Sequence, residues 1–147
     1  MTNINDSAKT NHNVSKEIKE LASAIFKTAP QIAHLGLIDL EGHVLLDQSS
    51  ASPEPMEPDK DRMMFYYQVG LRRSRREHFN NVYGLTQYVH VVRENMQQLI
   101  VYLPMMTIYL TVDESTKPDE IAIIAKKIQN VNKDVLEKAV KSMFYFQ

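Results

Sequence analysis

The stretch that decides the fold reads Gly36-Leu37-Ile38-Asp39-Leu40-Glu41-Gly42-His43-Val44-Leu45-Leu46-Asp47. Apolar residues flank the tight polar pair Glu41-Gly42, and this pattern predicts a β-hairpin. An amphipathic helix precedes the hairpin, and a second helix, three further strands and a last long helix follow it. The order α-β-β-α-β-β-β-α predicts an α+β sandwich, with helices flanking a five-stranded antiparallel sheet.

The remaining elements follow from periodicity, caps and breakers along the chain. Ser15 is suited to cap a first helix, Pro30 ends it, and three prolines mark 49–59 as a connecting loop. The predicted elements are a helix at 15–29, strands at 34–40 and 43–49, a helix at 60–79, strands at 84–93, 97–104 and 106–113, and a helix that opens over 115–120 and runs to nearly the end. We expect a disordered polar tail at 1–13, then one domain over 14–147 with an extended C-terminal helix.

The composition is that of an ordinary globular domain. The 147 residues carry 17 basic and 18 acidic side chains, a net charge of -1, so the chain has no long-range attraction to nucleic acid or anionic lipid. The absence of cysteine excludes disulfides, thiolate nucleophiles and cysteine-ligated metals. No apolar run approaches the roughly 20 residues of a membrane span. We expect a cytoplasmic protein.

The sequence shows no spacing that is typical of catalysis or of cofactor binding. Its histidines stand apart from one another and make no metal-ligand motif: His12, His34, His43, His78 and His90. Asp39, Glu41 and His43 meet near one turn, where carboxylates are usually solvated. None of the four glycines begins a phosphate-binding loop. We therefore expect no enzyme activity, no metal and no cofactor.

The predicted second helix is apolar on two sides. At 100° per residue, one face would hold Met63, Tyr67, Gly70, Leu71, Ser74 and His78, and the small Gly70 and Ser74 would let this face approach the sheet. The opposite face would hold Phe65, Val69, Arg72, Arg76 and Phe79. A helix of this kind needs two partners. One is its own sheet, and the other is either a second chain, which we favour, or an additional element such as the C-terminal helix.

The same helix carries the one dense basic cluster, Arg72-Arg73-Ser74-Arg75-Arg76. Its four guanidinium groups would bind an anion or an acidic partner surface. The alternative is a solvated face near the C-terminal end of the helix, where cations suit the helix dipole. The C-terminal tail is aromatic: the consecutive Phe144, Tyr145 and Phe146 cannot all face one core, so some meet a partner or fold back over the sheet.

Three parts of the chain resemble the roadblock family of small regulatory modules, also known from dynein light chains. The hairpin at 35–45 is similar to the first hairpin of that family, 88–104 to its third and fourth strands, and 108–112 to its fifth. The resemblance implies a profilin- or longin-like fold and a homodimer formed by the second helix and the strand after it. The implied interface residues are Phe65, Val69, Arg72, Arg76, Phe79 and Tyr88.

The resemblance also implies a function without catalysis. The chain would be a homodimeric regulatory or scaffolding module whose partner is a small Ras-like GTPase or a signalling complex. Two other classes stay open from the sequence. One is a PAS-like sensor domain that binds a small molecule in its sheet pocket, and the other is a nucleic-acid accessory protein that uses Arg72, Arg73, Arg75 and Arg76.

Overall fold

Of the 147 residues, the computed structural model describes 14–50, 55 and 57–145. Its elements are α2 (Lys16–Phe26), β1 (Ile32–Asp39), β2 (Val44–Ser49), α3 (Asp59–Glu77), α4 (Asn80–Tyr83), β3 (Val89–Val92), β4 (Gln97–Leu103), β5 (Met106–Val112), α5 (Pro118–Gln129) and α6 (Lys133–Tyr145). The strands form one sheet in the order β2-β1-β5-β4-β3, with every neighbouring pair antiparallel. This confirms the predicted sheet. The predicted tail at 1–13 and the side chains of Tyr145 and Phe146 lie outside the described residues.

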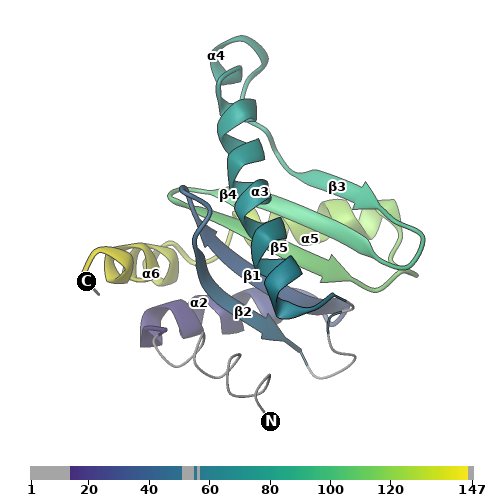
Figure 1. Cartoon of the computed structure of the whole chain (residues 1–147), viewed down its shortest axis with the longest axis horizontal. Coiled ribbons are helices and arrows are strands. Elements are labelled where there is room, and N and C mark those ends of the chain that lie inside the picture. The colour runs from purple at the N-terminus through teal and green to yellow at the C-terminus, as the bar shows by residue number, and fades with distance from the viewer. Residues whose placement is uncertain (1–13, 51–54, 56, 146–147) are drawn as a thin grey trace.

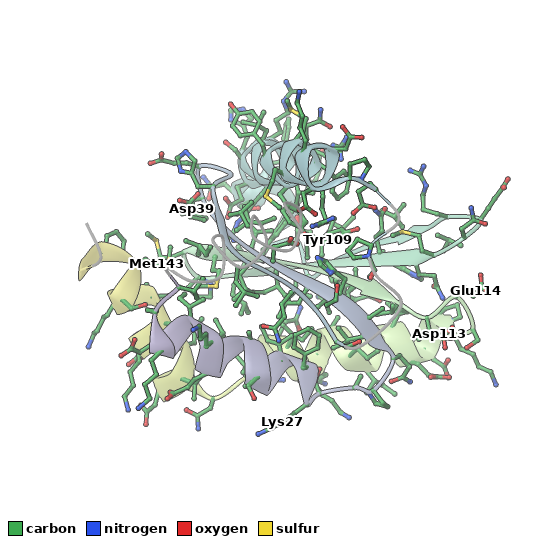
Figure 2. The ribbon with its side chains drawn as sticks, turned by 60° about the horizontal axis from the view of Figure 1, so that its bottom comes forward. Lys27, Asp39, Tyr109, Asp113, Glu114 and Met143 are labelled. Atoms are coloured by element: carbon green, nitrogen blue, oxygen red, sulfur yellow. The ribbon has the colours of Figure 1, made fainter. Side chains whose placement is uncertain are left out.

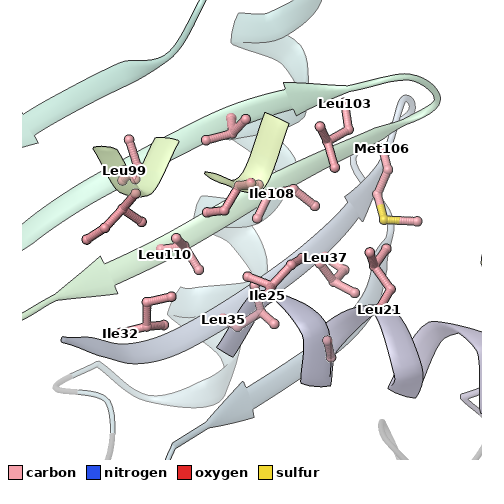
Figure 3. Packing of buried hydrophobic residues seen from close by; sticks show 14 of the residues in the cluster. Leu21, Ile25, Ile32, Leu35, Leu37, Leu99, Leu103, Met106, Ile108 and Leu110 are labelled. Atoms are coloured by element: carbon pink, nitrogen blue, oxygen red, sulfur yellow. The ribbon is translucent and has the colours of Figure 1, made fainter. Parts of the chain in front are cut away.

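The two faces of the sheet are covered differently (Figures 1 and 2). Helices α2, α5 and α6 lie against one face, while α3 alone crosses the other (Figure 2). The main core lies under the three helices, where Leu21 and Ile25 of α2 pack near Leu35 and Leu37 of β1 (Figure 3). A second, smaller core lies under α3. It contains Ile38, Tyr66, Val69, Ile100 and Tyr109.

Local side-chain chemistry sets the ends of the first elements. The Ser15 hydroxyl accepts a hydrogen bond from the backbone N of Ile18 at 3.1 Å, which caps α2 as predicted. In the β1–β2 turn, the Asp39 carboxylate accepts hydrogen bonds from the backbone N of Glu41 and His43. Gly42 has a φ of 90°, which a residue with a Cβ rarely adopts. The predicted hairpin is confirmed.

Two predicted elements differ from the structure. The predicted last helix is divided, because α5 ends before Asn130 and α6 begins at Lys133. The Asn132 side chain accepts hydrogen bonds from the backbone N of Asp134 and Val135 and so caps a new helix, which packs on α2. The strand predicted at 84–93 is shorter and runs from Val89 to Val92: α4 ends at Tyr83, Gly84 follows it with a φ of 84°, and residues 85–88 connect the two without a regular element.

Two glycines allow α3 to lie close to the sheet. A Cβ on Gly36 would stand 2.7 Å from Cζ of Tyr66, and a Cβ on Gly70 would stand 2.7 Å from the Cα of Gly42. The second contact joins backbone to backbone, so no flexible side chain can move aside. The predicted close approach at Gly70 is confirmed, whereas Ser74 is exposed.

We expect Gly70→Ala to lower the free energy of unfolding by about 1–3 kcal/mol, the usual cost of overpacking. This is the reverse of helix propensity, which favours Ala over Gly by about 1 kcal/mol. Urea denaturation measures the difference. The control Ser74→Ala, on the exposed side of the same helix, should stay within about 0.5 kcal/mol of the wild type. A Gly70→Ala protein as stable as the wild type would contradict the close packing.

Candidate interaction surface

The orientation of α3 differs from the prediction. Its buried residues are Arg62, Tyr66, Val69, Gly70 and Arg73. Tyr67 and Leu71, which were predicted to face the sheet, are exposed, and Val69, which was predicted to meet a second chain, is 1% exposed in the smaller core. The prediction for Val69 is therefore wrong. Two arginines occupy sheet-facing positions, and a pattern based on hydrophobicity places arginine on the outside.

A buried polar network fastens the first turns of α3 to the sheet. Its centre is the Asp47 carboxylate on β2, which accepts hydrogen bonds from Arg62 Nε at 3.0 Å, Arg62 Nη2 at 2.7 Å and the Tyr66 hydroxyl at 2.8 Å. His34 Nε2 lies 2.5 Å from Oδ1 of Asp47, and His34 Nδ1 lies 2.9 Å from Oγ of Ser49. Nothing in the sequence pattern singled out this network, although His34, Asp47 and Ser49 share one face of two paired strands.

The charges within the network stabilise one another. Burial alone would raise the pKa of Asp47, but the hydrogen bonds with His34 and Arg62 outweigh burial and hold its pKa well below the ordinary 3.8. Burial would likewise lower the pKa of Arg62, and the hydrogen bond and charge of Asp47 raise it above its ordinary range. Burial, together with the Asp47 charge, raises the pKa of Tyr66. The network therefore anchors α3 to the sheet through charged groups that are hydrogen-bonded to one another.

Replacing Asp47 should reveal this anchor in the pH dependence of stability. A depressed folded-state pKa adds stability above the unfolded-state pKa, and this stability is lost as the pH falls below about 4. At pH 6, Asp47→Asn should lower the free energy of unfolding by about 3–5 kcal/mol, because Arg62 is left buried without its counter-charge. Denaturant titrations between pH 2 and 6 should also show a shallower acid loss for this variant. The exposed Asp134→Asn serves as control, and equal slopes for wild type and Asp47→Asn would contradict the anchor.

The basic cluster does not act as one surface. Arg73 is 6% exposed, and its Nη1 donates to the Met106 carbonyl at 2.8 Å, while its guanidinium lies 4.9 Å from the centre of the Tyr102 ring. Nη1 of Arg76 donates to the Tyr102 hydroxyl at 2.8 Å. Arg72 and Arg75 are exposed. The prediction that Arg73 contacts an anion or a partner is wrong, since that side chain is buried between α3 and the sheet.

An open groove runs beside the first half of α3, between this helix and the β3–β4 turn. Its volume is about 670 Å³. Phe65 and Tyr109 line it, with their rings 5.2 Å apart in an edge-to-face arrangement, and Asp61 and Glu94 contribute carboxylates. The hydroxyl of Tyr109 accepts a hydrogen bond from Gln98 at 2.9 Å. Burial is the main reason why the pKa of this hydroxyl rises to about 12, and Glu57 adds to the rise.

Exposed apolar side chains gather on α3 and just beyond it. An outer stripe of Met64, Tyr67 and Leu71 lies on the side of α3 that faces away from the sheet. An apolar tip follows, in which the rings of Phe79 and Tyr83 stack with centroids 5.7 Å apart; Val82 and Leu85 complete it. The C-terminal end of α3 and α4 project beyond the sheet (Figure 1).

The residues of the predicted interface are distributed over this region. Phe65 is half-buried beside the groove, Phe79 is in the exposed tip, and Arg72 is exposed between them. Tyr88 is half-buried against the main core just before the edge strand β3. On β3 itself, Val92 is 72% exposed.

The part of the chain that the structure describes contains neither a metal-binding cluster nor a membrane-spanning helix. There, no group of three or more His, Asp or Glu side chains is arranged to hold a metal ion. Among the same residues, no helix is both long enough and apolar enough to cross a bilayer.

Val69→Asp should unfold the single chain and not merely separate two chains. The substitution places a charge without a partner among Tyr66, Ile100 and Tyr109 in the smaller core, and we expect a loss of at least about 3 kcal/mol in the free energy of unfolding. Circular dichroism during thermal unfolding measures the effect. A Val69→Asp chain with the wild-type melting temperature would show that this side chain does not lie in the core.

The fold resembles solved structures of MglB and of profilin. A structure described as MglB with a tetrameric arrangement gives a TM-score of 0.67 at 15% identity, covering 85% of this chain and 93% of that chain. The gliding protein MglB of Thermus thermophilus gives 0.65 at 13% identity, covering 87% and 93%. Profilin of Schizosaccharomyces pombe gives 0.52 at 10% identity, covering 75% and 90%. No family model and no curated protein matches the sequence. At these identities the likeness establishes the fold, which is the roadblock- and profilin-like arrangement that the sequence predicted.

Proposed function

We propose that this chain is a homodimeric regulatory or scaffolding module that acts in the cytoplasm and binds a small Ras-like GTPase or a complex that contains one. The observation that carries the proposal is the uneven cover of the sheet. Three helices seal one face, whereas α3 leaves a groove, an apolar stripe and an edge strand open on the other. Likeness in fold to MglB supports the same interpretation.

The homodimer would form through the flank of α3 that faces β3 and through β3 itself. Strands β2 and β3 are the two edges of the sheet. An edge strand presents unpaired backbone groups that a second strand can meet. Of the two edges, β3 shows the exposed apolar Val92, whereas β2 shows the polar Gln48. Burying side chains such as Val92 and Phe79 contributes about 1.5–3 kcal/mol each before the entropy of association is subtracted.

The outer stripe would remain exposed in such a homodimer, because it lies away from the sheet and not toward β3. We assign to it the contact with the GTPase. Met64, Tyr67 and Leu71 follow one another at helical spacing, and Leu40 is a further exposed apolar residue in the β1–β2 turn, whose Gly42 lies against α3. Apolar groups clustered on a surface in this way are typical of a site for a protein partner.

The regulatory role of the module would not depend on catalysis of its own. The hydrogen bonds from Ser49 to His34 to Asp47 are similar to those of a hydrolytic triad. Here, however, Arg62 and Tyr66 also donate hydrogen bonds to the Asp47 carboxylate, which lies beneath α3. The alternative of a nucleic-acid accessory protein has less support, since Arg73 and Arg76 both donate hydrogen bonds to residues of the sheet.

Val92→Lys should weaken the homodimer and leave the fold of the chain intact. A lysine on an edge strand opposes strand-to-strand pairing, and a two-fold axis would bring the two copies of this change near one another. Sedimentation velocity over a range of protein concentrations measures the dissociation constant, which we expect to rise at least about 10-fold. Ile123→Lys is the matched control, because Ile123 is also exposed and apolar but lies on α5, across the sheet. A wild-type chain that stays at 17.0 kDa at tens of micromolar would refute the homodimer.

Leu71→Asp should remove binding of the GTPase without affecting the homodimer. The carboxylate would interrupt the outer stripe and leave a charge facing an apolar partner surface. Purified Ras-like GTPases from the same organism, loaded with GDP or with a GTP analogue, provide the ligands for calorimetry. Ile123→Asp is the control for charge. If wild type and Leu71→Asp bound these GTPases equally, the outer stripe would not be the site.

A further inference from the structure

We propose that two copies of this chain recognise each other through a reciprocal charge pair, in which Arg72 of each copy enters the groove of the other and meets Asp61 there. The inference rests on the proposed homodimer and specifies its register. The chemistry that recognises the second copy is a guanidinium between a carboxylate and an aromatic ring.

The charges of α3 differ between its two halves. The first half balances Asp59 and Asp61 against Lys60 and the buried Arg62, whereas the second half carries four arginines and only one acid, Glu77. A two-fold axis across the helix reverses the direction of the partner helix. The first half of each copy, which holds the exposed Asp61, then faces the basic second half of the other, whereas parallel helices would place the two basic halves together.

Spacing places the two ends of the pair on the same flank. Asp61, Phe65, Gln68 and Arg72 fall within about 60° of one another at 100° per residue. Asp61 and Phe65 both line the groove on the β3 side of α3. If the axis passes between Phe65 and Gln68, each Asp61 lies opposite the Arg72 of the partner copy, and the polar Gln68 lies opposite Phe65.

The groove is lined by acidic and aromatic side chains, which can bind an arginine. Its lining includes the carboxylates of Glu57, Asp61 and Glu94 against the single guanidinium of Arg93, and the ring of Phe65. A carboxylate can accept two parallel hydrogen bonds from a guanidinium, and an aromatic ring attracts its flat face. Its volume of about 670 Å³ is ample for one side chain.

Among the arginines of α3, the structure favours Arg72 as the occupant. Arg62 and Arg73 are buried, and Arg76 donates to the hydroxyl of Tyr102. Arg75 points away from the sheet, about 60° around the helix from Arg72. Within the described ranges, the side chains of Arg72 and Asp61 make no hydrogen bond or ion pair, so both are available to a second copy.

Charge exchange between two single variants tests the pairing. In Asp61→Arg, two arginines would meet at each end of the interface, and in Arg72→Glu, two carboxylates would meet. Because the two-fold axis repeats each contact, we expect the dissociation constant of either homodimer to rise about 100-fold. An equimolar mixture of the two variants should form a heterodimer, since it restores an opposite pair at both ends.

Light scattering and native mass spectrometry measure the masses of the single variants and of the mixture. Arg75→Glu, which makes the same change of charge outside the proposed flank, should dimerise like the wild type. Circular dichroism confirms that each variant is folded. If either variant fails to fold, the neutral pair Asp61→Asn and Arg72→Gln replaces it, and each of these should weaken the homodimer and reduce its sensitivity to salt.

The outcomes separate this inference from the homodimer itself. Monomeric single variants that form a heterodimer when mixed would support the charge pair. Single variants that dimerise like the wild type would overturn the pair and leave the homodimer standing. Variants that stay monomeric when mixed would also overturn the pair. A monomeric wild type would overturn both.

Discussion

The ion pair between Asp47 and Arg62 determines where α3 can lie. It joins the second strand to the first turns of the helix through two short hydrogen bonds, and Tyr66 and His34 complete the shell around the carboxylate. A buried charge without this shell would cost several kcal/mol. The helix is therefore fixed in rotation as well as position, and its rotation decides which side chains stay outside.

With α3 fixed in this way, the helices on the two faces of the sheet are held by different interactions. The face under α2, α5 and α6 is sealed by aliphatic packing and supplies most of the apolar burial (Figure 3). The face under α3 is held by specific polar contacts and two close glycine contacts. A single helix is narrower than the sheet that it crosses, so the groove beside Phe65 and the edge at β3 follow from the architecture.

Much of the fold could be predicted from local signals, and the parts that could not are those that depend on distant pairs. Glu41-Gly42 marked the hairpin because turn chemistry is local. The break at Asn130 to Asn132 escaped prediction because the apolar period continues through Val131 while the asparagine caps interrupt it. The rotation of α3 was wrong because apolar residues lie on several sides of it, and Arg62 and Arg73 face inward. Their partners, Asp47 and the Met106 carbonyl, come from other elements, so no pattern within the helix reveals them.

The packing of α6 on α2 has a consequence for how the chain is made. The hydroxyls of Ser15 and Ser142 lie 2.8 Å apart although the two residues are 127 positions apart in the sequence, and Ala139 and Met143 of α6 pack on the main core with Ile18 of α2. Contacts between such distant residues close late in folding. On the ribosome, α2 is synthesised before α6, so the side of α2 that packs on α6 has no cover until α6 has left the exit tunnel. Until then the nascent chain keeps an apolar helix surface open, and this surface is where a chaperone would be expected to hold it.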